Sequence, residues 1–215
     1  FFLNLIPGTY TLKEVVGVGW INLTAVEIPV VLDSGEIDSN NDFINVKYAS
    51  ITVYKNVDNN GDGDISDIGV DKLGVTDWTW DIDGVGNYAT GYTVQNVMPG
   101  TYVISEEQKD NFHVTGLECN NGMNYGAVES QSITIASGQD LSCTFINSRN
   151  LGTLIVKKVV VNDDGGTLEA KDFSFKIDGG SPISFESDGE NQFTKYAGLT
   201  YNITRSEEHT SELQS

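Results

Sequence analysis

Basic residues are scarce in this chain of 215 residues. Lys and Arg together number 12, against 31 Asp and Glu, which leaves a formal net charge of -19 at pH 7. Because a negative field of this strength repels phosphate groups, we predict no nucleic-acid partner and no affinity for anionic membrane surfaces. The same field favours divalent cations as ligands.

Long apolar runs and helical periods are missing as well. No apolar run approaches the roughly 18 residues of a membrane-spanning helix, so we predict no membrane insertion of this stretch. No window repeats its apolar residues at helical spacing. The aromatic and β-branched residues come instead in short runs between glycine-containing turns, which predicts an all-β protein of short strands.

Cysteine is almost absent, with Cys119 and Cys143 the two that the chain contains. Two cysteines do not make a disulfide-dense scaffold, so we predict one structural bridge in an oxidising compartment. Closing the loop between them would stabilise the fold by about 3 kcal/mol on the chain-entropy model. Two buried free thiols are the alternative.

One turn and the strand after it recur along the chain. The clearest copy is Pro99–Glu106, with an earlier copy at Pro7–Glu14 and a weaker one at Gly198–Thr204. Pro and Gly form the turn, and the strand then alternates, so that Tyr102, Ile104 and Glu106 share one face. Corresponding residues of successive copies lie about a hundred residues apart, which is the length of one β-sandwich domain.

The repeat predicts a tandem array with very short, semi-rigid joints. We assign residues 1–48 to the C-terminal half of a truncated domain, 49–149 to a complete domain, and 150–204 to the N-terminal half of a third. Residues 205–215 break the repeat where its Glu is expected, and they resemble a translated sequencing-library adapter. We interpret them as a non-native tail; a natural polar tail is the alternative.

Three motifs together carry a family resemblance. They are a Lys at the end of the first strand, a Pro-Gly-x-Tyr turn that leads into a Tyr-x-x-x-Glu strand, and a closing strand that ends in Asn. In this combination residues 1–204 resemble the prealbumin-like B-type domains of bacterial surface proteins. These are the collagen-adhesin B-type and pilin-like modules and the serine-aspartate repeat B domains.

The resemblance implies a fold and a function. The fold is a series of tandem prealbumin-like (Ig-like) β-sandwiches, one complete and two truncated. The function is a structural stalk that projects an adhesive head from the bacterial cell surface, outside the cell and without enzymatic turnover. The expected partners are neighbouring repeats of the same chain, with any host or cell-surface ligand bound through other domains. The alternative is a ligand-binding adhesin module for protein or carbohydrate, which an exposed aromatic patch would favour.

Lys55, Glu106 and Asn147 are candidates for an intramolecular isopeptide bond. Each ends an alternating row of otherwise apolar residues, so parity turns all three toward the core. Burial lowers the pKa of a lysine and raises that of a glutamate, which gives a neutral amine and a protonated acid. In the pilin-like domains that the chain resembles, Lys and Asn are joined in this way with Glu as the catalyst.

Alternatives to the bond stay open at this point. Lys55 could extend to solvent and pair with Glu106, while Asn147 caps a turn. The other repeats are incomplete, because the first keeps Glu14 and Asn45 without a Lys strand and the third keeps Lys158 without its Glu and Asn. The middle repeat alone carries all three residues.

An acidic loop follows the first strand of the middle repeat. Its alternating oxygen-bearing residues have the spacing of the front of an EF-hand loop, which predicts a Ca²⁺ site. The serine-aspartate B domains have a loop of this kind. The twelfth position is Gly69 instead of a bidentate Glu, and a solvated acidic turn is the alternative. The candidate ligands are Asp58, Asn60, Asp62, Asp64, Ser66 and Asp67.

Overall fold

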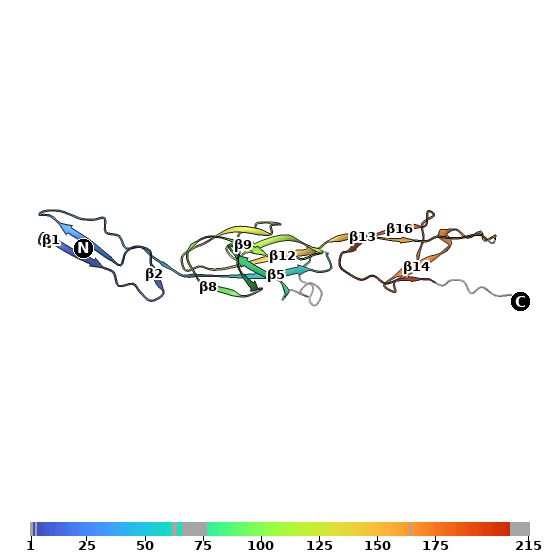
Figure 1. Ribbon diagram of the computed structural model, residues 1–215, viewed down its shortest axis with the longest axis horizontal. Coiled ribbons are helices and arrows are strands. Elements are labelled where there is room, and N and C mark those ends of the chain that lie inside the picture. The colour runs from blue at the N-terminus through green and yellow to red at the C-terminus, as the bar shows by residue number, and fades with distance from the viewer. Residues whose placement is uncertain (1, 3, 62–63, 66–76, 164, 207–215) are drawn as a thin grey trace. The chain divides into compact units, whose positions relative to one another are not determined.

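The computed structural model describes residues 2, 4–61, 64–65, 77–163 and 165–206. These residues form an almost purely β structure, as the sequence predicts, with a short 3₁₀ helix at Ala170–Asp172 (Figure 1). Within the described part of the chain no helix has the length and apolarity to cross a membrane. Contacts divide the described residues into two compact units. One contains residues 2, 4–57, 77–108 and 114–147, and the other contains 58–61, 64–65, 109–113, 148–163 and 165–206.

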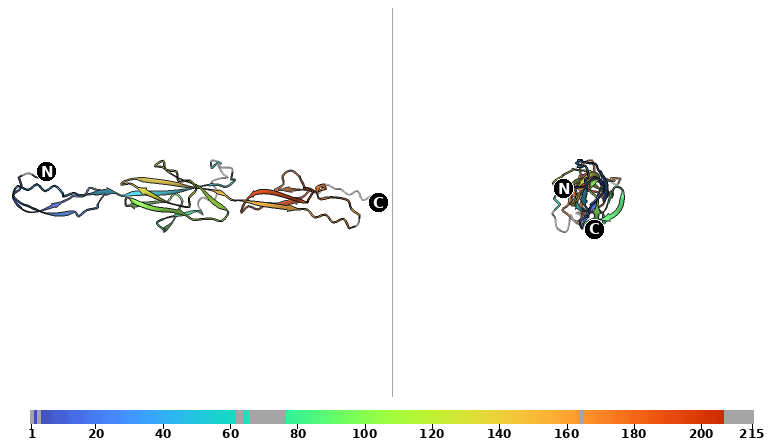
Figure 2. Two further views of the ribbon diagram at one scale, coloured as in Figure 1. Left: turned by 90° about the horizontal axis from the view of Figure 1, so that it is seen from above. Right: turned by 90° about the vertical axis from the view of Figure 1, so that its left-hand side faces the viewer.

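Two four-stranded sheets form the middle of the chain (Figures 1 and 2). The first sheet has the order β10-β12-β5-β8, and its strands are β5 (Ala49–Asp58), β8 (Thr93–Val97), β10 (Phe112–Cys119) and β12 (Asp140–Arg149). The second has the order β11-β9-β6-β7, and its strands are β6 (Thr79–Ile82), β7 (Val85–Ala89), β9 (Gly100–Glu106) and β11 (Ser130–Ile135).

The core lies between these sheets and follows the alternation of the strands. Ile51, Ile104 and Phe145 come from β5, β9 and β12, and each exposes at most 1 % of its surface. These residues belong to one cluster that extends over both sheets. Burying them removes large apolar areas from water, at about 25 cal/mol per Å², and this is the main stabilisation of the domain.

The disulfide predicted from the sequence is present. Cys119, at the end of β10, is bonded to Cys143 in β12, with the Cα atoms 4.0 Å apart. The bridge joins two neighbouring strands of one sheet and lies in the core cluster. The free-thiol alternative is therefore wrong.

The first and last strands of the middle domain, β5 and β12, lie side by side and run parallel. Near the start of β5, Ser50 Oγ donates to Asp140 Oδ1 at 2.6 Å, and near its end Asp58 Oδ2 accepts from Ser148 Oγ at 3.1 Å. Both pairs are 90 residues apart, and a constant separation of this kind arises only when two strands run in the same direction. The chain therefore enters the domain at one end of the sheet and leaves at the other.

Tyrosine hydroxyl groups anchor the recurrent Pro-Gly-x-Tyr turns. Tyr102 donates its hydroxyl to Met98 O at 2.7 Å, and Tyr10 donates to Ile6 O at 2.6 Å. In both repeats the acceptor lies four residues before the tyrosine. The tyrosine of the motif thus satisfies a backbone carbonyl at the turn, a role that the alternation pattern alone does not reveal.

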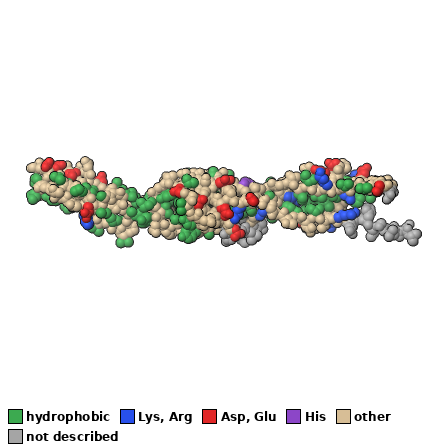
Figure 3. All heavy atoms as spheres, in the orientation of Figure 1, with side chains coloured by type: hydrophobic (Ala, Val, Ile, Leu, Met, Phe, Trp, Pro, Cys, Tyr) green, Lys and Arg blue, Asp and Glu red, His purple; other side chains and the backbone are tan. Residues whose placement is uncertain are grey.

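The N-terminal strands form two small antiparallel ribbons. One pairs β1 (Gly8–Lys13) with β3 (Glu27–Leu32), and the other pairs β2 (Trp20–Asn22) with β4 (Asn45–Lys47). Of the described hydrophobic residues before Ala49, Val30 alone is buried, with 6 % of its surface exposed. Hydrophobic side chains remain on the surface of this N-terminal part of the chain (Figure 3). The most exposed lie in the segments that flank and connect the strands, and they are Phe2, Ile6, Val15, Val18 and Ile37.

The C-terminal strands repeat the register of the middle domain. They pair β13 (Leu151–Lys157) with β16 (Glu190–Tyr196), and place β14 (Ser174–Ile177) between β15 (Ile183–Ser184) and β17 (Ile203–Arg205).

In β14 Phe175 lies opposite Arg205, as Trp80 lies opposite Glu106 in the middle domain. Arg205 therefore occupies the position of the repeat's Glu. The rest of the predicted tail, residues 207–215, lies outside the described residues.

Candidate functional site

Lys55, Glu106 and Asn147 meet in the interior of the middle domain. They come from β5, β9 and β12, so the group spans both sheets. Their exposed fractions are 7 %, 8 % and 1 %. The sequence predicts that Lys55 ends the row of inward-facing residues in β5, and this is wrong. Val57, two residues further along the same strand, is also buried.

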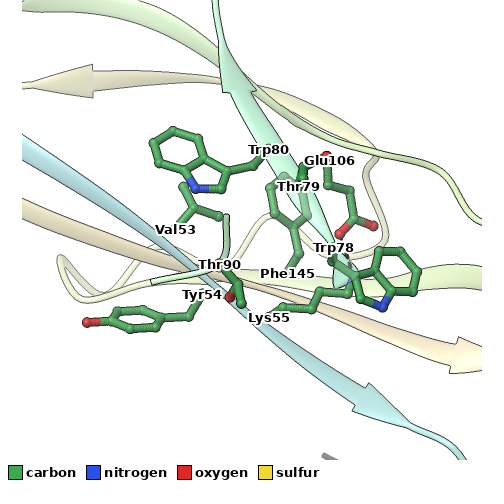
Figure 4. Close-up of a pocket in the computed structure, with 9 residues that line it drawn as sticks. All are labelled: Val53, Tyr54, Lys55, Trp78, Thr79, Trp80, Thr90, Glu106 and Phe145. Carbon is green, nitrogen blue, oxygen red and sulfur yellow. Dashed lines mark hydrogen bonds and ion pairs between the residues drawn. The ribbon is translucent and has the colours of Figure 1, made fainter. Parts of the chain in front are cut away.

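The lysine amine connects the other two groups. Lys55 Nζ donates hydrogen bonds to Glu106 Oε2 and to Asn147 Oδ1. Figure 4 shows Lys55 and Glu106 beside Trp78. The alternative in which Lys55 extends to solvent is therefore wrong. The three residues that the sequence singled out lie in direct contact, with the amine next to the side-chain amide.

Trp78 forms one wall of this site. The lysine Nζ lies 3.9 Å from the centroid of the Trp78 ring, and the tryptophan exposes only 4 % of its surface. The sequence places Trp78 in the hydrophobic core beside Trp80, but Trp80 alone joins the main core cluster. The signal that could have revealed this contact is the third repeat, where Phe173 precedes its strand as Trp78 precedes β6.

Burial shifts the protonation of both titratable groups toward their neutral forms. Burial lowers the pKa of Lys55 to about 8, although the Glu106 carboxylate opposes this shift. Burial also raises the pKa of Glu106, again against the opposing effect of Lys55. Both shifts thus favour the uncharged forms, which are a free amine at Lys55 and a protonated acid at Glu106.

Two buried atoms of the site have no hydrogen-bond partner among the residues that the structure describes. They are Glu106 Oε1 and Asn147 Nδ2. A buried polar atom without a partner costs about 1–3 kcal/mol, so the site as it stands is destabilised. A reaction that expels the Asn147 nitrogen would remove one of these two atoms from the core.

The surrounding cavity is small. Its volume is about 10 Å³, and its walls include Val53, Trp80 and Phe145. This volume holds about one water molecule, and ammonia is of similar size. The arrangement therefore fits chemistry between the protein's own side chains, with a small leaving group, and this cavity has no room for an organic substrate.

Comparison with known families identifies the surroundings of the site. Residues 47–145 match the SpaA-type prealbumin-like fold domain. This stretch is a prealbumin-like domain of bacterial surface proteins. Domains of this type are structural modules of pilins and other surface proteins, which indicates an extracellular or cell-surface location. No curated protein matches the chain.

The acidic loop of the prealbumin-like domain is described only in part. Asp58 is buried, and its two carboxylate oxygens accept hydrogen bonds from Gly61 N–H and Ser148 Oγ. Asp62, Ser66 and Asp67 lie outside the described residues. Among the residues that are described, no group of three metal-ligating side chains comes together. Asp58 is thus fixed at the start of the loop, and the calcium site stays a prediction.

A pH-dependent stability follows from the two pKa shifts in the prealbumin-like domain. An Asn147→Ala variant cannot form a bond to Lys55 and keeps both titratable groups. Its stability should fall as the pH rises above the ordinary pKa of glutamate, because the folded state keeps the Glu106 proton that the unfolded state loses. It should rise again between about pH 8 and the ordinary pKa of lysine, because the unfolded state then binds the extra proton.

Urea unfolding of Asn147→Ala across this pH range measures the effect. The matched control is the same variant with Lys55→Met and Glu106→Gln. Its stability should show neither the fall above the ordinary pKa of glutamate nor the rise between about pH 8 and the ordinary pKa of lysine. Identical plots of stability against pH for the two proteins would show that the pKa of neither Lys55 nor Glu106 is shifted.

Proposed function

We propose that this chain belongs to the load-bearing stalk of a bacterial surface protein, with an isopeptide bond between Lys55 and Asn147 locking the middle domain. The observation that carries the proposal is the contact of Lys55 Nζ with both Glu106 and Asn147 in the core. The match of residues 47–145 to surface-protein domains supports it.

The bond forms by exchange of one amide nitrogen for another. The neutral amine of Lys55 attacks Cγ of Asn147, while protonated Glu106 polarises the amide carbonyl. The bond from Cγ to Nδ2 breaks, and this nitrogen leaves as ammonia after receiving a proton through Glu106. Glu106 ends in its original protonation state, so the step needs no oxidant, reductant or other co-reactant.

The position of the bond gives it a mechanical role. Lys55 and Asn147 are 92 residues apart, and they lie on the parallel strands through which the chain enters and leaves the domain. A force along the chain would pass from β5 through the bond into β12. The intervening residues, which could otherwise extend by roughly 300 Å, would carry no load. A stalk that holds an adhesive head under tension needs this property.

We also propose that the acidic loop after β5 binds Ca²⁺. The ligands would be the side-chain oxygens of Asp58, Asn60, Asp62 and Asp64, completed by Ser66 and Asp67. The orientation of Asp58 by Gly61 and Ser148 supports the proposal, because it fixes the first ligand. The cation would offset the mutual repulsion of the loop carboxylates on a chain of net charge -19.

The intact mass tests the isopeptide bond. The purified chain should be lighter than its sequence by one ammonia in addition to the hydrogens lost to the disulfide. Glu106→Ala should restore the ammonia, because the amide carbonyl is then no longer polarised. Glu107→Ala changes the neighbouring exposed carboxylate, so it serves as the control and should keep the lower mass. A wild-type chain of full sequence mass would refute the bond.

Thermal unfolding tests the calcium site. Added Ca²⁺ should raise the melting temperature of the middle domain, since a hundredfold excess over Kd stabilises the native state by about 2.7 kcal/mol. Chelator should reverse the shift, and Mg²⁺ should replace Ca²⁺ poorly because it demands octahedral geometry. Asp62→Ala should abolish the shift, whereas Asp110→Ala in another loop should retain it. The absence of any calorimetric signal at millimolar Ca²⁺ would leave the loop as a solvated turn.

A further inference from the structure

The side-chain amide of Asn147 can react with two different nucleophiles. In the reaction proposed for the middle domain, the Lys55 amine attacks Cγ and the product is an isopeptide bond. A water molecule that attacks the same carbon would expel the same ammonia and leave a carboxylic acid. Both routes would use the polarisation of the amide by Glu106, so the choice between them depends on other groups around the site.

Trp78 contacts the nucleophile that the isopeptide bond requires. The centroid of its ring lies 3.9 Å from Lys55 Nζ, and the same nitrogen contacts Glu106 Oε2 and Asn147 Oδ1. A lysine amine carries at most three protons, so two hydrogen bonds and one ring face account for all of its directions. The three groups together hold the nitrogen beside the amide that it attacks.

The same tryptophan limits the access of water. It exposes 4 % of its surface and lines the cavity of about 10 Å³ beside Lys55. The indole ring is apolar apart from its N–H, whereas a buried water needs about two to four polar partners. A small side chain at this position would enlarge the cavity and let water approach the Asn147 amide.

An aromatic ring over a lysine recurs in the C-terminal repeat. Lys158 Nζ lies 4.0 Å from the centroid of the Phe173 ring. Phe173 directly precedes β14, as Trp78 directly precedes β6. Because one ring is a phenyl group and the other an indole, the shared property is the aromatic face and not the indole N–H. A phenyl ring should therefore replace the Trp78 ring without loss.

We propose that Trp78 determines which nucleophile reaches Asn147, because its ring holds the Lys55 amine beside the amide and keeps water out. This inference rests on the isopeptide bond proposed for the middle domain. Trp78 is a positioning residue, since it exchanges no proton and forms no bond in the reaction.

The competing reaction follows when the ring is removed. Water attacks Cγ of Asn147, the bond from Cγ to Nδ2 breaks, and this nitrogen leaves as ammonia after receiving a proton through Glu106. The water oxygen stays on Cγ, so the side chain ends as a carboxylic acid. The step consumes one water and needs no oxidant or reductant.

Intact mass measurement and tryptic peptide mapping, both after reduction, distinguish the products in the full chain. A cross-linked chain is lighter than its sequence by one ammonia, whereas a hydrolysed chain is heavier by the difference between a hydroxyl and an amino group. Wild type and Trp78→Phe should be cross-linked without hydrolysis. In Trp78→Ala the ratio of cross-linked to hydrolysed chain should fall by about a hundredfold, the cost in rate of misplacing a reacting atom by about 1 Å.

Two further variants separate this role from packing alone. Leu117 is fully buried in the core cluster but does not line the cavity beside Lys55. Leu117→Ala should therefore destabilise the domain and still give a cross-linked chain without hydrolysis. Trp78→Ala combined with Glu106→Ala should give neither product, because both routes use the glutamate.

Circular dichroism shows whether each variant is folded. If Trp78→Ala does not fold, Trp78→Met fills much of the same space without an aromatic face, and its products are compared with those of Trp78→Phe. Hydrolysis in the methionine variant alone supports the inference, and equal products overturn it.

Several results would overturn the inference and leave the isopeptide bond standing. One is a folded Trp78→Ala chain that is fully cross-linked, and another is the same hydrolysed share in Leu117→Ala. A Trp78→Ala chain that stays unreacted would also overturn it, because water then does not compete for the amide. A wild-type chain of full sequence mass would instead refute the bond itself.

Discussion

The removal of three polar side chains from water is the constraint on which the middle domain depends. Lys55, Glu106 and Asn147 lie between the two sheets, where charge is costly and each unpaired atom destabilises the fold. Burial pushes the amine and the acid toward their neutral forms, which are the forms that react with an amide. Desolvation would destabilise a core in which these three side chains have not reacted. It also favours the neutral amine and the protonated acid that the proposed reaction needs, and the reaction would remove one of the unpaired atoms.

Sheet topology turns this local chemistry into a property of the whole domain. Because the first and last strands are parallel neighbours, a bond between Lys55 and Asn147 would connect the entry and the exit of the chain. In the proposed reaction Glu106 would act from the opposite sheet, so the bond would form only after the sandwich has closed. The disulfide between Cys119 and Cys143 adds a second covalent tie on the same sheet.

The sequence predicted the fold class, the disulfide and the inward orientation of the three site residues, because alternation in a strand determines which face a side chain occupies. It could not predict that Trp78 lies against Lys55, because alternation says nothing about which residues meet across two sheets. The tyrosine hydroxyl bonds at the turns were missed because alternation gives the face that a side chain occupies and not the backbone carbonyl that its hydroxyl reaches. The unpaired nitrogen of Asn147 also required coordinates, since an unsatisfied atom is defined by what surrounds it.

Peptide mapping tests the central claim most directly. After reduction and digestion with trypsin, the peptide containing Lys55 should be found joined to the peptide containing Asn147, with no cleavage after residue 55 because its amine is acylated. Fragmentation should locate the link between these two side chains. Two separate peptides, with cleavage after Lys55 and an intact Asn147 amide, would contradict the account.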